Sequence, residues 1–257
     1  MEDFILFFFV GFLAQAVDGA LGMAYGVISS TTLLAFGVTP VHASAAVHAA
    51  ELFTTAASGS SHLYHRNVDW TLFWRLAPFG MLGGACGAYV LTSFEGATIK
   101  PFVTTYLAII GVWLLVRAFR KLPTNPVPAG VVAPLGATGG FLDAAGGGGW
   151  GPIVTTGLLG AGAPPRYVIG TVNACEFLVA LTISLSFLVA LVTGRWSEAA
   201  GTGTAAAIAG LILGGVLAAP LAGWLVKGLN ERLLLLVVGV LIVLLAGWQT
   251  AQQLGFL

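Results

Sequence analysis

Charged residues are scarce in this chain of 257 residues. Asp, Glu, Lys and Arg together make up 8% of the sequence, whereas 58% of it is hydrophobic. Soluble domains carry about 25% charged and roughly 45 to 50% apolar residues, so the composition excludes a water-soluble fold and predicts an integral membrane protein. The apolar stretches leave no room for a separate soluble catalytic domain of ordinary size. The function must therefore reside in the membrane part.

Several functional motifs are also missing. The net charge is zero and the longest basic cluster is Arg117, Arg120 and Lys121, which argues against a nucleic-acid partner. Cys86 and Cys175 lack the spacing of a metal site. The sequence contains no nucleophile elbow, no phosphate loop and no two-histidine zinc motif. We therefore expect neither an enzyme nor a bound cofactor or metal.

The apolar residues fall into eight stretches, and the first and the fifth are too long for one ordinary span of about 20 residues. Both long stretches are interrupted by glycines and an acidic residue, which predicts discontinuous or re-entrant helices. The stretches are 4–36, 41–64, 71–93, 101–116, 131–162, 168–192, 201–226 and 233–248. The predicted fold class is an all-α, polytopic membrane protein.

The two halves of the chain are diverged copies of one unit. Residues 14–53 laid over residues 139–178, at an offset of 125 and without a gap, share thirteen identities in forty positions. The identities include Asp18 with Asp143, Gly22 with Gly147, Gly26 with Gly151, Thr31 with Thr156, Gly37 with Gly162, Pro40 with Pro165, and Glu51 with Glu176. This predicts a first repeat at 1–121, a linker at 122–130 and a second repeat at 131–257.

The distribution of basic residues favours inverted repeats. If all eight stretches span the membrane, the ten Lys and Arg residues divide six to four between the two sides. If the long stretches are hairpins that return to the side they left, only Lys100 and Arg195 fall outside and the other eight lie inside. Discontinuous helices that meet at the interface of inverted repeats are a known transporter architecture.

The glycine-rich breaks suggest a binding site for an anion. Four consecutive glycines, Gly146 to Gly149, precede Pro152, which suits the first turn of a new helix. A helix N-terminus at membrane depth presents backbone N–H groups and a partial positive charge to a ligand. The predicted substrate-binding residues at the two breaks are Gly22, Gly26, Thr31, Gly147, Gly148, Gly149, Gly151, Thr155 and Thr156. The alternative interpretation is that the glycines only permit close helix packing.

Four acidic residues are expected at membrane depth, where a charged group costs about 2.5 to 3.5 kcal/mol. They are Asp18, Glu51, Asp143 and Glu176. One interpretation is a proton relay; the other is structural, with carboxyl groups capping the broken helices or bonding to Asn173 or Thr171. His48 corresponds to Asn173 in the second repeat and precedes Glu51 by three residues, on the same helical face. His48 and Asn173 are therefore added to the predicted binding residues.

The arrangement resembles the sulfite exporter TauE/SafE family of membrane permeases across almost the whole chain. The resemblance rests on two homologous halves, each with a glycine-rich break and a following proline turn: 146–152 with 162–165, and less closely 19–26 with 37–40. It implies transport of sulfite, sulfonates or related oxyanions, mostly in prokaryotic inner membranes. The sequence departs from the family pattern in its first copy, which lacks the rich glycine run, and in Asp18 and Asp143 beside the breaks.

The leading hypothesis is therefore a secondary transporter or facilitator for a small sulfur-containing anion in the inner (plasma) membrane. A cation or metal permease that uses the intramembrane Asp, Glu and His groups is the second hypothesis, and a membrane scaffold without transport is the third. The expected partners are a small anionic substrate and the lipid bilayer, and the sequence leaves a homo-oligomer open.

Overall fold

The computed structural model describes residues 2–120, 128–196, 204–225 and 231–256, and its regular structure in these ranges is entirely helical. An all-α fold is thus confirmed. The first half comprises α1 (Glu2–Leu21), α2 (Tyr25–Ala35), α3 (Pro40–Tyr64), α4 (Trp70–Leu91) and α5 (Gly96–Arg117). The second half comprises α6 (Ala129–Gly146), the π-helical turn η1 (Gly151–Thr155), α7 (Thr156–Gly160), α8 (Pro165–Val192), α9 (Thr204–Leu225) and α10 (Glu231–Gln253).

Both long apolar stretches are broken where the glycines predicted a break. Gly22 and Gly147 follow the ends of α1 and α6 with φ of +66° and +68°, a left-handed conformation that glycine adopts without strain. The two pieces of the first stretch are unequal, because α1 has 20 residues and α2 has 11, which correspond to lengths of about 30 Å and 16 Å. The break therefore lies well past the middle of the stretch. After the second break, the chain first forms the π-helical turn η1 and then becomes α-helical in α7.

Three helices of the described ranges are long and apolar enough to cross a membrane: Gly96–Arg117, Pro165–Val192 and the Arg232–Gln253 part of α10. Helix α3 is long as well, with 25 residues, but it carries polar side chains along its length. Several of them, including His48, Glu51 and Ser58, are buried inside the protein. The polarity of α3 thus reflects its place in the interior of the bundle.

The helices of the two halves pack in matched pairs. Helix α1 packs along α9, and its counterpart α6 packs along α4, which is the counterpart of α9. Helix α3 likewise packs along α8, and α5 along α10. Glycines allow the closest of these approaches: Gly83 faces the backbone of Ala137 across α4 and α6, and Gly214 faces the backbone of Phe8 across α9 and α1. This exchange of partners is consistent with the predicted two-fold relation between the halves.

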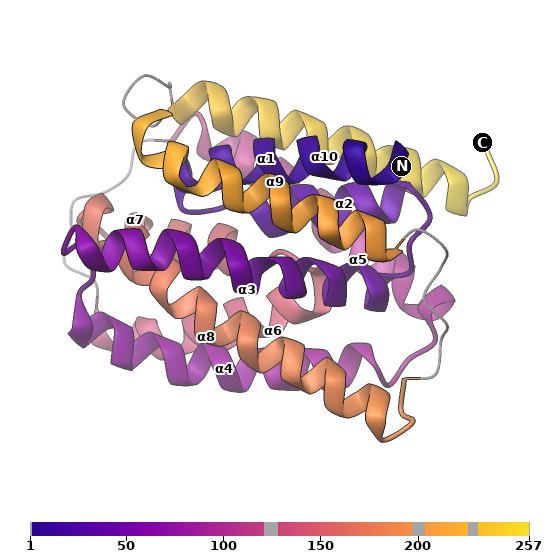
Figure 1. Ribbon diagram of the computed structural model, residues 1–257, viewed down its shortest axis with the longest axis horizontal. Helices are drawn as coiled ribbons and strands as arrows, with labels where there is room; N and C mark the ends of the chain where they lie inside the picture. Colours follow the sequence, from indigo (N-terminus) through magenta and orange to yellow (C-terminus); the bar gives the residue numbers. More distant parts are fainter. Residues whose placement is uncertain (1, 121–127, 197–203, 226–230, 257) are drawn as a thin grey trace.

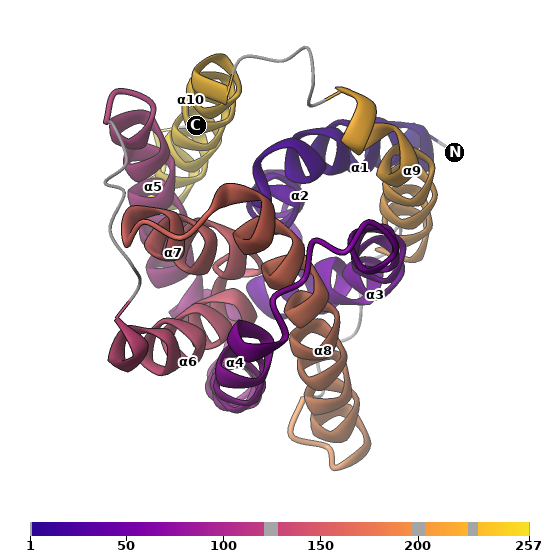
Figure 2. The same cartoon turned by 90° about the vertical axis from the view of Figure 1, so that its left-hand side faces the viewer.

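The hairpins of the two halves open toward opposite ends of the molecule. Helix α1 begins at the right of Figure 1, where the N-terminus is marked, and α2 returns to that side to enter α3. Helix α7 lies at the left of Figure 1 and faces the viewer in Figure 2, where it leads into α8. The orientation of the halves across a bilayer remains a prediction. Most of the predicted linker, through residue 127, lies outside the described residues, and α6 already begins at Ala129.

Candidate functional site

The two helix breaks meet in the centre of the bundle, backbone against backbone. A Cβ atom on Gly26 would lie 2.8 Å from the carbonyl oxygen of Gly147, and one on Gly151 would lie 2.6 Å from Cα of Met23. A Cβ atom on Gly148 would collide with the backbone of Val27. These glycines therefore have the packing role that the sequence offered as the alternative to substrate binding.

Asp18 and Asp143 cap the helices that follow their own breaks. Oδ1 of Asp143 accepts the backbone N–H of Gly149 at 2.7 Å and that of Trp150 at 3.0 Å. Oδ1 of Asp18 accepts the N–H of Tyr25 at 3.3 Å, at the corresponding position of the first repeat. Gly22 and Gly147 donate instead to the carbonyl oxygens of Asp18 and Asp143, at 2.6 Å each. The expectation that these N–H groups await an anion is wrong for Gly22, Gly147 and Gly149, because carboxylate or carbonyl oxygens already satisfy them.

The predicted hydroxyl donors are also engaged. Thr31 donates to the carbonyl oxygen of Val27 in its own helix at 2.6 Å. Thr155 reaches across to the first break and donates to the carbonyl oxygen of Gly22 at 2.7 Å. Thr156 contacts the sulfur of Met23 at 3.8 Å. Thr155 and Thr156 therefore tie the second break to the first.

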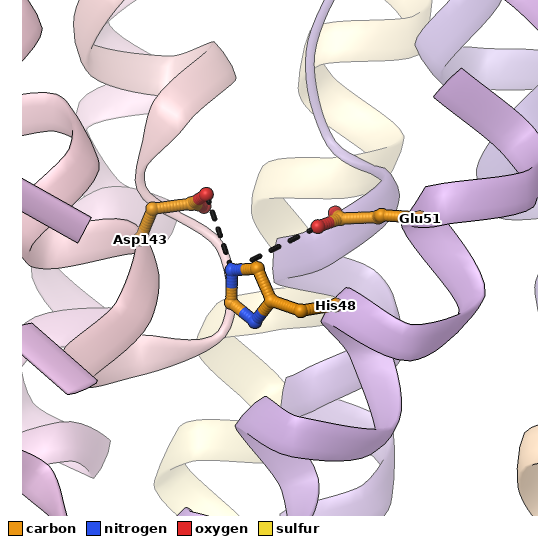
Figure 3. Close-up of side chains that lie close together, drawn as sticks. All are labelled: His48, Glu51 and Asp143. Atoms are coloured by element: carbon orange, nitrogen blue, oxygen red, sulfur yellow. Dashed lines mark hydrogen bonds and ion pairs between the residues drawn. The ribbon is translucent and has the colours of Figure 1, made fainter. Parts of the chain in front are cut away.

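His48 lies against Asp143 at the same junction. Nδ1 of His48 is 2.7 Å from the carbonyl oxygen of Ser44, one turn earlier on α3. Nε2 is 3.2 Å from Oδ2 of Asp143 and 3.8 Å from Oε2 of Glu51. Figure 3 shows Asp143 approaching from α6, on the side opposite α3, with the imidazole between the two carboxyl groups. All three side chains are buried.

The acids of the two repeats share one electrostatic environment. Asp18, Glu51, Asp143 and Glu176 are all buried, and Glu176 interacts electrostatically with the other three. Asn173 and Thr171 do not bond to these acids in the contacts observed. Asn173 donates to the carbonyl oxygen of Ile169 at 3.1 Å and accepts the hydroxyl of Ser58 at 2.9 Å, while Thr171 accepts the N–H of Asp69. We refer to His48 and the four acids as the polar centre.

Within the described residues, four buried polar atoms on α1, α2 and α3 lack a hydrogen-bond partner. They are the amide nitrogen of Gln15, the hydroxyl oxygens of Ser29 and Thr54, and Oε2 of Glu51. Gln15 lies three residues before Asp18, Ser29 four residues after Tyr25, and Thr54 three residues after Glu51, so each shares a helical face with a residue of this region. Unpaired buried polar groups are rare in proteins and call for an explanation.

The polar centre is closed to solvent, and cavities lie elsewhere in the molecule. One cavity of about 450 Å³ is bounded by α4 and α8 and includes Tyr89 and Arg195; another, of about 540 Å³, lies between α4 and α6 and is almost entirely apolar. Neither includes a residue of the polar centre. Within the described part of the chain, one ligand atom each of His48, Glu51 and Asp143 lie within 4.8 Å of one another, an arrangement that could hold a metal ion.

Three residues that position this site were not predicted from the sequence. Tyr25 and Trp150 each supply the capped N–H after a break, and Ser44 fixes the ring of His48. The repeat does contain a signal for the first two, because Trp150 corresponds to Tyr25 at the offset of 125. Nothing comparable marks Ser44, whose hydroxyl donates to the carbonyl oxygen of Ala144 on α6.

Comparisons with known proteins agree on a family. The family model described as "Sulfite exporter TauE/SafE" matches residues 7–249. A protein of Bacillus subtilis (strain 168) named "Probable membrane transporter protein YtnM" is 41% identical over 251 residues, which cover 95% of this chain and 81% of that protein. No solved structure matches the chain.

Proposed function

This chain belongs to the sulfite exporter TauE/SafE family of membrane transporters, and from that premise we propose that it moves a small sulfur-containing anion, such as sulfite or a sulfonate. It is a multi-pass membrane transporter rather than an enzyme. The proposed path runs through the plasma membrane at the junction of the two helix breaks. The transporter acts as a secondary transporter or facilitator, bringing the anion to the buried polar centre.

The unpaired donors beside the polar centre are the observation that carries this proposal. The amide nitrogen of Gln15 and the hydroxyls of Ser29 and Thr54 are buried and lack an acceptor. Leaving such a group unpaired costs about 1 to 3 kcal/mol. An oxyanion supplies several strong acceptors and removes that cost when it binds. These three donors take the place of the N–H groups of Gly149 and Trp150, which Asp143 already occupies.

The residues predicted from the sequence have two roles in this proposal. His48 and Asn173 face the centre as polar contacts for the anion, and Thr155 and Thr156 join them when their contacts across the breaks open. The glycines at positions 22, 26, 147, 148, 149 and 151 let the two breaks approach closely enough to form one site. Asp18, Glu51, Asp143 and Glu176 act as proton relay or structural acids.

The test is flux into proteoliposomes that contain the purified protein. Labelled sulfite and labelled methanesulfonate should each be offered in separate experiments, with empty vesicles measuring passive leakage. We expect uptake of at least one of the two above leakage, with competition between them. Equal rates in loaded and empty vesicles for both anions would contradict the proposal.

The alternative hypothesis, a cation permease, predicts the opposite effect of removing the acidic side chains on transport. The variant Asp18→Asn/Asp143→Asn keeps a side-chain oxygen at both caps but removes two negative charges. Anion flux should persist or rise in this variant because repulsion is reduced, whereas a cation pathway should fail. Flux of Na⁺, K⁺ and divalent cations in the same vesicles completes the comparison.

A further inference from the structure

The hydrogen bonds of His48 require more protons than a neutral imidazole paired with a carboxylate can supply. The carbonyl oxygen of Ser44 only accepts hydrogen bonds, so Nδ1 of His48, 2.7 Å away, carries a hydrogen. Nε2 would then present a lone pair to Oδ2 of Asp143, 3.2 Å away. Two lone pairs repel at this distance. A further proton must therefore lie between His48 and Asp143.

Glu51 provides a second acceptor for that proton. Its Oε2 is 3.8 Å from the same Nε2, is buried, and has no hydrogen-bond partner. Asp143 differs because two backbone N–H groups already bond to its Oδ1. A small shift of the imidazole toward Glu51 would form a bond that the present conformation lacks. His48 thus lies between one acceptor that is bonded and one that is not.

Within the described part of the chain, the titratable groups found to interact electrostatically with the four acids are acids, phenols and the thiol of Cys175, which interacts with Glu176. Asp18 on α1, Asp143 on α6 and Glu176 on α8 interact electrostatically with one another or with Glu51, and α8 also places the Phe187 ring 6.4 Å from the imidazole. The phenols are Tyr25 on α2, which interacts with Asp18 and Glu51, and Tyr106 on α5, which interacts with Asp143. Within the described polar centre, His48 is the side chain that can become a cation. An anion that enters among four acids needs such a charge.

In the second repeat, the residue at the position that corresponds to His48 has no dissociable proton. Asn173 corresponds to His48, and its side chain donates to the carbonyl oxygen of Ile169, four residues earlier, as His48 donates to that of Ser44. The local hydrogen bond is therefore preserved, and the ability to carry a proton is not. This asymmetry supplies a natural substitution for the histidine.

We propose that His48 is the proton carrier of this transporter, holding a proton against Asp143 and passing it to Glu51 as the anion moves. In the transfer, the N–H bond at Nε2 breaks and an O–H bond forms at Oε2 of Glu51, which leaves the imidazole neutral. Glu51 then releases this proton to the water on the side that the anion leaves, and the imidazole takes up the next proton from the water on the side where the anion enters. One proton thus accompanies one anion. This inference rests on the proposed function, because it assigns the co-substrate of the same site.

The experiment measures whether a pH gradient drives the anion. Methanesulfonate is the probe because it stays ionised over the working pH range and carries no proton itself. Proteoliposomes with the membrane potential clamped at zero should accumulate it about tenfold for each unit by which the lumen is more alkaline. A dye in the lumen should report acidification with the same time course. The variant His48→Asn should show neither accumulation nor acidification, and any downhill flux of methanesulfonate that remains should not depend on the pH gradient.

A control variant separates this result from a general effect of losing a buried histidine. His42 is also buried on α3, where its ring lies 4.8 Å from that of Trp196, outside the polar centre. His42→Asn should therefore keep the tenfold accumulation. Accumulation by His48→Asn at the wild-type level would overturn the inference while the proposed function stands. Loss in His42→Asn equal to that in His48→Asn would also overturn it.

A second measurement does not depend on flux. Nitrogen-15 NMR of histidine-labelled protein at neutral pH should show one imidazolium, with both ring nitrogens protonated, that disappears in His48→Asn. An imidazolium signal of His48 that persists unchanged in Asp143→Asn would contradict a proton shared between the two residues. If wild-type protein transports neither methanesulfonate nor sulfite, the proposed function fails, and the NMR result alone decides whether His48 holds the proton.

Discussion

Asp143 bonds to different partners with its two oxygens, and Asp18 shows only part of this pattern. Asp143 accepts two backbone N–H groups at Oδ1 and faces His48 with Oδ2, whereas Asp18 accepts a single N–H at 3.3 Å. Loss of a helix cap costs about 1 kcal/mol, and up to about 2 in some proteins. We expect Asp143→Ala to lower the midpoint of thermal unfolding in detergent by more than Asp18→Ala. Asp143→Asn keeps an acceptor and should fall between Asp143→Ala and wild type. Equal effects of the two alanine variants would show that the caps do not differ.

Thr54 distinguishes stability from binding at the level of a single side chain. Its hydroxyl is buried without a partner. Thr54→Val should therefore leave the free energy of unfolding unchanged or raise it by up to about 1 kcal/mol, and the unfolding midpoint should stay the same or rise accordingly. If the hydroxyl donates to the anion, the same variant should raise the KM for sulfite or methanesulfonate several-fold. Thr182→Val on α8 is the matched control, since that hydroxyl bonds to its own helix at Leu178. A stabilised Thr54→Val protein with an unchanged KM would remove Thr54 from the proposed site.

At the scale of elements, the contact between α2 and the second break depends on Gly148. A methyl group there would meet the backbone of Val27, and overpacking of this kind costs about 1 to 3 kcal/mol. Gly160, the last residue of α7, has open space where its Cβ would be, so an alanine there meets no neighbour and reduces the conformational freedom of the unfolded chain. Gly148→Ala should therefore lower the unfolding midpoint, whereas Gly160→Ala should leave it unchanged or raise it. Similar midpoints for the two variants would mean that the breaks are not tightly packed.

The same elements show what the sequence could predict. The helix breaks were predictable because glycine and proline act locally, and the pairing of Asp18 with Asp143 was predictable because the duplication preserves both residues. The hydrogen-bond partners of the backbone N–H groups after each break were not predictable. Whether a nearby carboxylate accepts these N–H groups or leaves them available to a ligand depends on the fold around the break. The contact of His48 with Asp143 joins residues 95 positions apart. The repeat aligns His48 with Asn173 instead and contains no trace of that contact.

At the scale of the whole molecule, the predicted two-fold relation between the repeats would account for both the packing and the placement of the polar centre. Helices α3 and α8 are counterparts, pack against each other, and carry Glu51 and Glu176 at corresponding positions. Because α1 and α6 are also counterparts, a two-fold relation brings both breaks to the same interior region. A site built this way contains two similar halves, and the exchange of asparagine for histidine makes only one of them able to carry a proton.

The inverted orientation of the halves can be tested with one pair of cysteines. Val38 and Ala163 follow the ends of α2 and α7 and correspond at the offset of 125. In a background with Cys86 and Cys175 replaced by alanine, Val38→Cys and Ala163→Cys should react with a membrane-impermeant maleimide from opposite sides of the cell membrane. The placement of Lys100 and Arg195 predicts Val38→Cys outside and Ala163→Cys inside. Labelling of both from the same side would contradict the predicted inverted orientation of the repeats across the membrane, in which only Lys100 and Arg195 of the ten basic residues lie outside.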